Sequence, residues 1–411
     1  MRKILFAILL LHATAVYAQP TISAEIASGP LPFPAFVSLL PAPAVAMARD
    51  RTGIAIAWQM SGPDGDRINV VRLDATGHFT GNVQTIPAAS TDFVYAIAPS
   101  IAAAPRGDGF TLAWLEIPAT AAPMTRAVYC RLDRDLKPSA PAILIVTPQP
   151  APAIVRSGKK TWISAGASAW ELRDDGSLSA PLNAGMSAAD MTVATDFPQI
   201  VGLGRDVTIG QVCPIGCGSG GRITFCRCPF EPITITRNSL QFTSLYSITV
   251  SKQLTFLTDA APAVGNNGRD VAVVWFNQLQ QQGGGTVMMS QILPPSFANS
   301  PTALNQPRGL GNFSADGGPT RPDIASDGER YVVVWRTAAK DGSHDIAGAS
   351  IDRDGNVVPL SIATSQDDER DPSVIALGDG RFLVAYDKLG NGEHRIAGRF
   401  VTFEGRTHAV R

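Results

Sequence analysis

The sequence predicts an all-β fold on two observations. Only 17% of the 411 residues are charged and 45% are hydrophobic, while the chain carries 38 Gly and 31 Pro. So many turn-forming residues in an apolar chain are typical of many short strands, and we find no long helical period in the mature chain. The second observation is a repeat, because short apolar strands such as "YVVVW" at 331–335 recur along the whole sequence.

The N-terminus has the form of a secretory signal. In residues 1–18, "MRKILFAILLLHATAVYA", Arg2 and Lys3 precede an apolar stretch, and "VYA" forms a small-residue cleavage site. The apolar stretch is too short to span a membrane, so we expect a secreted or periplasmic protein; an uncleaved anchor is the alternative. Without the signal, 34 − 2 = 32 basic residues face 35 acidic ones, a charge of −3. This predicts no binding to nucleic acid and no attraction to anionic lipid.

Each repeat unit begins with a proline followed, two residues on, by Ile or Val. A turn, usually with Gly, and an apolar strand come next. The prolines are Pro43, Pro99, Pro152, Pro198, Pro262, Pro322 and Pro372. The apolar strands are 54–58, 110–114, 162–165, 207–211, 271–275, 331–335 and 382–386. Most units add a third strand, such as 67–74, "GRITFCRC" from 221 and 345–352, and several then turn through Asp and Gly, as at 173–177 and 352–356.

Units of 46 to 64 residues are too long for one coil of a β-helix and have the length of a propeller blade. Blades stack face to face, so their inner strands are covered on both sides and read as continuous apolar runs. We therefore predict a single seven-bladed β-propeller over 19–411, with blades starting near 43, 99, 152, 198, 262, 322 and 372. A row of unrelated sandwich domains is the alternative, and the common phase of the seven prolines disfavours it.

The seventh unit has no room for a fourth strand, because only ten residues follow Val401. An N-terminal stretch, "TISAEIAS" at 21–28, belongs to no unit of its own. We expect it to form the outer strand of the last blade and so close the ring, which removes a pair of open sheet edges.

The sixth unit, "PDIASDGERYVVVWRTAAKDGSHDIAGASIDRDGN" from residue 322, resembles the repeat of uncharacterised secreted bacterial β-propellers. That repeat carries Pro-x-Ile-Ala-x-Asp-Gly, an aromatic-Val-Val-Trp strand, Asp-Ile-x-Gly and an Asp-Gly turn. The match is close in the sixth unit, fair in the first, second, fifth and seventh, and weak in the third and fourth. The resemblance implies the fold over most of the mature chain, and it carries no catalytic motif.

Other motifs that carry chemistry are missing. The turn at 352–355 lacks the Ser and Trp of the sialidase box, and "DRDGN" at 352–356 offers at most three side chains with oxygen ligands, so a hairpin turn is favoured over calcium binding. No zinc-binding His spacing, nucleophile elbow or phosphate-binding loop occurs. We predict no cofactor and assign no metal ligand; a structural zinc or calcium ion stays open as an alternative.

Four cysteines, Cys213, Cys217, Cys226 and Cys228, crowd into the fourth unit. In an exported chain the leading interpretation is two disulfides that hold an enlarged hairpin. A four-cysteine zinc site is the alternative, although the Cys-x-x-x-Cys and Cys-x-Cys spacings are poor for it. Cys130 falls on the third strand of the second unit, and we expect it to be a free thiol in the core.

The loops of the sixth and seventh units are unusually polar on the face where first strands begin and second strands end. The expected ligand-binding residues are Arg321, Asp323, His344, Asp345, Arg370, Asp371, Asp387, Glu393 and His394, with Asp341 beside them. His344 and His394 occupy equivalent loop positions. Adjacent blades would gather these charges and two imidazoles into one site; solvated loops without a ligand are the alternative.

The sequence thus favours an exported binding or scaffold module that recognises a glycan, another polymer or a protein partner through its loop face. The alternative is an extracellular hydrolase or lyase acting on a glycan, with acidic residues at the mouth of the channel. The binding module is favoured over an enzyme because we find no nucleophile constellation or metal signature. Fold alone does not decide between them.

Overall fold

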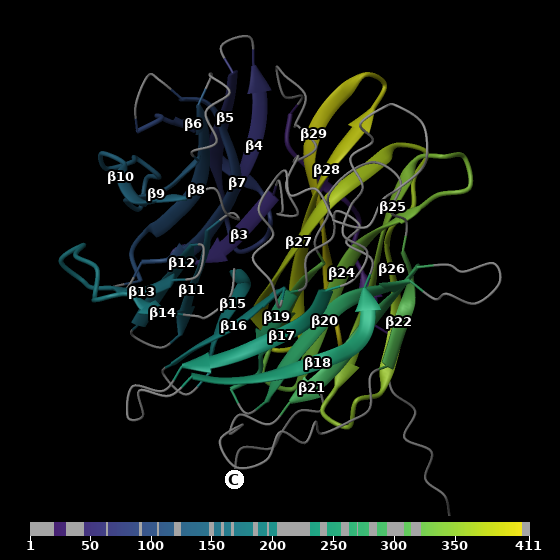
Figure 1. Ribbon diagram of the computed structural model, residues 1–411. Coiled ribbons are helices and arrows are strands. Elements are labelled where there is room, and N and C mark those ends of the chain that lie inside the picture. The colour runs from purple at the N-terminus through teal and green to yellow at the C-terminus, as the bar shows by residue number, and fades with distance from the viewer. Residues whose placement is uncertain are drawn as a thin grey trace, which may run out of the picture.

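The computed structural model (Figure 1) describes residues 20–29, 45–62, 65–89, 93–104, 107–118, 125–147, 152–157, 160–165, 168–183, 188–194, 197–203, 231–238, 245–255, 263–268, 270–278, 286–293, 308–313 and 322–404. These residues form strands, turns and connecting segments without any helix, as the composition predicted. The described part of the chain accordingly holds no helix that is long and apolar enough to cross a membrane.

The strands of the first half are β1 (Thr21–Ile22), β2 (Ile26–Ala27), β3 (Val45–Arg49), β4 (Ile54–Gly62), β5 (Gly65–Leu73), β6 (Phe79–Ile86), β7 (Phe93–Ala103), β8 (Phe110–Pro118), β9 (Thr125–Leu132), β10 (Ala142–Thr147), β11 (Ala153–Ser157), β12 (Lys160–Ala165), β13 (Ser168–Leu172) and β14 (Leu182–Asn183). Those of the second half are β15 (Ala188–Ala194), β16 (Phe197–Leu203), β17 (Glu231–Asn238), β18 (Leu245–Thr255), β19 (Ala263–Asn266), β20 (Val271–Gln278), β21 (Thr286–Leu293), β22 (Arg308–Phe313), β23 (Asp323–Ser326), β24 (Arg330–Ala338), β25 (His344–Asp352), β26 (Val357–Ala363), β27 (Asp368–Gly378), β28 (Arg381–Gly390) and β29 (Glu393–Thr402).

Four consecutive strands, paired antiparallel in chain order, form the repeated unit. Four sheets have this composition: β11 to β14, β15 to β18, β19 to β22 and β23 to β26. The groups β3 to β6 and β7 to β10 repeat the order and are joined into one sheet by a single parallel pair, Asp66↔Tyr95. The last sheet holds β27, β28 and β29, with β1 and β2 along the outer side of β29.

The first strands of these groups meet around a central cavity. β3 contacts β7, β7 contacts β11, and the series continues through β15, β19, β23 and β27, which contacts β3 again. In Figure 1 the yellow β27 accordingly lies beside the purple β3. The cavity has a volume of about 580 Å³ and is lined by residues of β3, β7, β11, β19, β23 and β27. Small side chains, including Ala48, Ala102 and Ala376, leave this space open.

The run at 331–335 in β24 is buried on both faces, as predicted. None of its five residues is more than 2% exposed. Tyr331, Val333 and Trp335 pack into one apolar cluster with residues of β19 and β20, whereas Val332 and Val334 pack into another with residues of β28. A strand that separates two apolar clusters gains nothing from polar alternation, which explains the continuous apolar sequence.

The N-terminal stretch lies along the last sheet, the partner that the sequence predicted for it. It forms two short strands: Thr21 pairs with Thr402 in β1, and Ile26 pairs with Gly398 in β2. Between them the backbone N–H of Ser23 donates to the Phe400 carbonyl at 2.9 Å, so the contact with β29 continues.

The structure differs from the predicted boundaries in the fourth unit. Pro198 lies in β16, the second strand of its sheet, and the first strand is β15. A Pro-x-Ile pattern marks a buried strand without saying which strand of the sheet it is, and the uneven spacing around Pro198 was the available warning. The expected second strand at 207–211 and third strand from 221 lie outside the described residues; the strand that pairs with β16 is β17.

Candidate binding site at one end of the central cavity

The polar residues singled out in the last two units lie near the ends of five strands. The structure places Asp323 first in β23, His344 and Asp345 first in β25, Arg370 and Asp371 in β27, Asp387 in β28, and Glu393 and His394 first in β29. Arg321 lies outside the described residues. His344 pairs with Ala338 and His394 with Leu389, each three positions after the buried aromatic residue of its neighbouring strand, so the two histidines hold equivalent register positions.

His344 and Arg370 meet on a carboxylate that the sequence analysis did not select, that of Asp368. His344 Nδ1 lies 2.8 Å from Asp368 Oδ1, and the His344 backbone N–H donates to the same oxygen at 3.1 Å. Arg370 Nη2 lies 2.5 Å from Asp368 Oδ2. Burial tends to raise the pKa of Asp368, but the hydrogen bonds from Arg370 and His344 hold it below its usual value. The three side chains join the sixth unit to the seventh through one charged network.

Asp371 is an acid of the site with a strongly raised pKa. It is only 4% exposed, and burial raises its pKa to about 7. The positive charge of Arg336, itself 0% exposed, opposes the rise, and the carboxylate of Asp387 adds to it. A carboxyl group with this pKa exchanges its proton near neutral pH, which few surface carboxylates do.

The backbone at Asp371 has a conformation that residues other than Gly rarely adopt. Its φ is +48°, and Ala98 in β7 has φ +56°. Both residues precede the proline of their repeat, and in both the antiparallel register shifts at that point. The bulge therefore belongs to the repeat. Asp tolerates the left-handed region better than most residues, and here the bulge holds a carboxyl group at the start of an inner strand.

Asp387 and His394 form a second pair, and Asp387 lies opposite Arg370 in the pairing of β28 with β27. His394 Nδ1 lies 3.2 Å from Asp387 Oδ1 and 3.3 Å from Oδ2. Asp387 is 3% exposed, and burial raises its pKa although the hydrogen bond from His394 works against the rise. The two histidines thus hold equivalent positions but different carboxylates, one in the next unit and one on the adjacent strand.

Three predicted residues belong to neither pair: Asp323 and Glu393 make other contacts, and Asp345 is partly unpaired. Asp323 accepts hydrogen bonds of 2.8 Å from Ile324 N, Ser373 Oγ and Val374 N, which tie β23 to β27. Glu393 forms an exposed ion pair with Arg395 at 2.6 Å. Asp345 Oδ1 is buried without a hydrogen-bond partner among the described residues, and burial raises the pKa of this carboxyl group.

The two residues that the sequence analysis missed have recognisable signals. Arg336 directly follows the apolar run and its Trp, at a position where β4 and β28 carry the buried polar residues Gln59 and Asp387. Asp368 stands two positions before Arg370, so strand alternation puts both on one face. A charged residue that continues a fully buried strand is a stronger marker of a site than a charged loop residue is.

No protein-family model and no curated protein matches the sequence. Among solved structures, the chain is similar to the WD40 domain of coronin from Toxoplasma gondii, with a TM-score of 0.54 and 10% identity over 93% of this chain and 87% of that one. WD40 repeats build propeller blades. The chain folds as a β-propeller. It is also similar to a protein of unknown function from Dyadobacter fermentans (TM-score 0.46, 12% identity, 93% and 99% of the two chains) and to an α-L-arabinanase from Penicillium chrysogenum (0.48, 10%, 93% and 99%).

These polar groups lie together on the loop face of the propeller, at the end where the first strands begin. They offer guanidinium and imidazole donors beside carboxyl groups of different acidity, which suits recognition of a ligand rich in hydroxyl or amide groups. The described residues contain no group of three or more His, Cys, Asp or Glu side chains placed to hold a metal ion. Cys213, Cys217, Cys226 and Cys228 lie outside the described residues, so their pairing stays a prediction.

Proposed function

We propose that this protein is an exported, seven-bladed β-propeller that binds a polar ligand, with a glycan as the first candidate, through its loop face. The observation that carries the proposal is the buried Asp371, held in a strained backbone conformation near the buried Arg336 and the partly buried Arg370. Burying charged groups is costly for stability even when they are paired. Such a cost concentrated at the end of the propeller where the first strands begin is the pattern of a functional site.

The blade count and the closure of the ring are part of the proposal. Seven groups of antiparallel strands, and the contacts of their first strands from β3 round to β27 and back, support seven blades. The pairing of β1 and β2 with β29 supports closure by the N-terminal segment. The sequence of residues 1–18 supports export, and export supports disulfides among the four cysteines of the fourth unit.

A thermal-shift screen of the mature protein against glycans tests the proposal. A ligand at a hundred times its dissociation constant stabilises by about 2.7 kcal/mol, which is easily measured. The Arg370→Gln variant removes the guanidinium beside Asp368 and should abolish the shift. Arg353→Gln is the matched control, because Arg353 forms an exposed pair with Glu329 at 2.6 Å away from the site. An equal shift in both variants would overturn the assignment of the site. If no glycan in the panel shifts the melting temperature, the ligand is not among these glycans and a protein partner becomes the candidate.

A glycan-acting enzyme is the second candidate, and the raised pKa of Asp371 favours it. A carboxyl group protonated near neutral pH can serve as a general acid, and Asp387 supplies a second buried carboxyl group close by. Release of reducing ends from a polysaccharide panel tests this function. Activity that is lost in Asp371→Asn while ligand binding persists would establish the enzyme, and a panel without turnover leaves the binding module.

A further inference from the structure

Two arginines line the central cavity at the end away from the loop-face site. Arg49 is the last residue of β3 and Arg156 is the fourth residue of β11, each next to the hairpin that leads into the second strand. Both hairpins lie at the same end of the propeller as the hairpin between β7 and β8: Arg51 N, just after β3, donates to Gly107 O in that hairpin at 3.3 Å, and Arg156 Nη1, in β11, donates to Ala104 O at its start. Asp323, the first residue of β23, lies at the opposite end of the cavity wall.

Both arginines make the same contact with the preceding blade. Arg49 Nη1 donates to the carbonyl of Leu377, and Arg156 Nη1 donates to the carbonyl of Ala104 at 2.5 Å. Each acceptor directly follows an alanine that pairs with the first Phe of a second strand, Ala376 with Phe382 and Ala103 with Phe110. The repeat thus orients both guanidinium groups through backbone carbonyls. Arg49 has no carboxylate partner among the described residues.

The described residues that line the cavity supply no negative charge at this end. Asp323 is the one acidic residue among the described residues that line the cavity, and its carboxylate already accepts three hydrogen bonds from β23 and β27. Asn266 and Ser326 are the other polar residues near the arginines, and both are neutral. A cavity of about 580 Å³ with guanidinium groups at one end has the size of a small-molecule site.

We propose that the arginine end of the cavity binds a small molecule through an oxyanion, that is a carboxylate, sulfate or phosphate group. The planar fork of a guanidinium matches the geometry of these anions, and charge-assisted hydrogen bonds to them are stronger than those between neutral groups. The alanines of β3, β7 and β27 leave room for the anion beside the two side chains. This site is separate from the loop-face site, and it does not depend on the function proposed there.

Isothermal titration of the mature protein with sodium phosphate, sodium sulfate and sodium citrate, at constant ionic strength set with chloride, tests the proposal. We expect saturable binding of at least one of the three anions, and their order of affinity distinguishes the group recognised. Arg49→Gln and Arg156→Gln should each weaken that binding at least tenfold, and the double variant should abolish it. Arg353→Gln, an exposed arginine contacting Gly328 O at the same end, is the matched control and should bind as the parent does.

Two results would overturn the proposal: no saturable binding of any of the three anions, or equal affinity in the double variant and the control. The Arg49→Lys variant is a control for a folding defect, because it keeps the positive charge but lacks the planar guanidinium group. Intermediate affinity in a lysine variant that melts like the parent supports recognition by the guanidinium. Titration with a loop-face ligand should be unaffected by all of these substitutions, which keeps failure here distinct from failure of the glycan proposal.

Discussion

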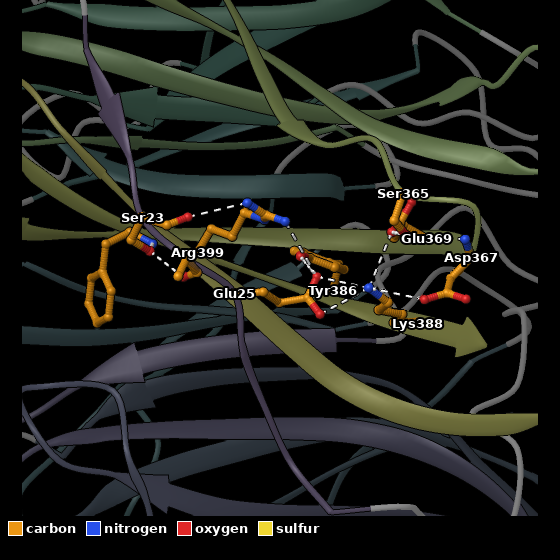
Figure 2. A network of polar contacts seen from close by, with 10 residues as sticks. Ser23, Glu25, Ser365, Asp367, Glu369, Tyr386, Lys388 and Arg399 are labelled. Atoms are coloured by element: carbon orange, nitrogen blue, oxygen red, sulfur yellow. Dashed lines mark hydrogen bonds and ion pairs between the residues drawn. The ribbon is translucent and has the colours of Figure 1, made fainter. Parts of the chain in front are cut away.

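Glu25 and Lys388 join the two ends of the chain: Lys388 Nζ lies 2.9 Å from Glu25 Oε1 and 3.0 Å from Oε2 (Figure 2). Lys388 also lies 3.2 Å from Asp367 Oδ2, and Tyr386 donates its hydroxyl hydrogen bond to Glu25 at 2.8 Å. Arg399 Nη1 donates to the Ser23 carbonyl at 3.2 Å. The N-terminal segment is therefore held by side chains of β28 and β29 as well as by its backbone pairs.

The Lys388→Met variant should lower the free energy of unfolding by about 3 kcal/mol, because it leaves the carboxylates of Glu25, Asp367 and the fully buried Glu369 without their shared cation. Urea titration at pH 7 measures the loss. Lys160→Met is the control: its pair with Glu171, at 3.6 Å, has side chains 34% and 29% exposed, so its loss should cost about 0–1 kcal/mol. Equal costs would mean that the network does not hold the segment.

Removing residues 19–30 should lower the melting temperature by many degrees. The truncation deletes β1, β2 and Glu25, and it exposes the backbone of β29 as an unpaired edge. Scanning calorimetry measures the melting temperature, and light scattering detects the self-association that an open edge promotes. A truncated protein that melts like the full one and stays monomeric would contradict closure of the ring by this segment.

Cys130 should resist alkylation in the folded protein and react after unfolding. Its side chain is free and 1% exposed in β9, as the sequence predicted, and burial raises the pKa of its thiol to about 12. Alkylation requires the thiolate and access to solvent, and the fold removes both. Mass spectrometry after labelling with and without urea gives the result; rapid labelling of the native protein at Cys130 would show that the second blade opens.

The fold was predictable because its determinants are local and repeated. The apolar run of β24, the Asp-Gly turn at 352–356 and the stretch that became β1 and β2 each read correctly from a few neighbouring residues. The predicted boundaries of the fourth unit were wrong because a Pro-x-Ile pattern identifies a buried strand but not its position in the sheet. The end of the propeller at which the polar groups gather was also predictable, because the order of the strands determines which loops share a face.

The contacts within the site were not predictable, because they depend on side-chain direction across blades. His344 and His394 hold equivalent positions, yet one meets Asp368 of the next blade and the other meets Asp387 beside it. Asp323 looked like a ligand-binding acid, but its carboxylate is used to join β23 to β27. Arg336 and Asp368 were not predicted because they lie within strands rather than in polar loops.

The Asp368→Asn variant should destabilise the protein by about 1–3 kcal/mol at pH 7. The folded-state pKa of Asp368 lies below its usual 3.8, so its ionised form contributes stability that is present above the unfolded pKa and is lost as pH falls through the folded one. The difference between variant and parent should therefore shrink as pH falls from 7 to below 3.8. Asp354→Asn, a substitution in the exposed turn at 352–356, is the control and should change neither value. A constant difference across this range would contradict the assigned contacts with His344 and Arg370.

Removing the charge of Asp371 in the Asp371→Asn variant should stabilise the folded protein at neutral pH instead of destabilising it. The folded-state pKa of Asp371 is raised from 3.8 to about 7, so the folded protein binds the proton more tightly than the unfolded chain does. Its contribution to stability is thus present below about pH 4 and falls as pH rises to about 7, by up to about 4 kcal/mol for a shift of this size. Asn keeps the volume and tolerates φ +48°, so the variant should gain stability relative to the parent as pH rises.

Urea titrations of both proteins at pH 4.5, 6 and 8 measure this difference. Asp387→Asn is the matched comparison, because burial also raises the pKa of Asp387 but its hydrogen-bond partner is His394, whereas the first charge that acts on Asp371 is that of Arg336. If the difference in the free energy of unfolding between Asp371→Asn and the parent is constant from pH 4.5 to 8, Asp371 does not titrate in this range. A constant difference would also remove the acid on which the enzymatic alternative depends, whereas a steep difference would leave both candidate functions for glycan assays to decide.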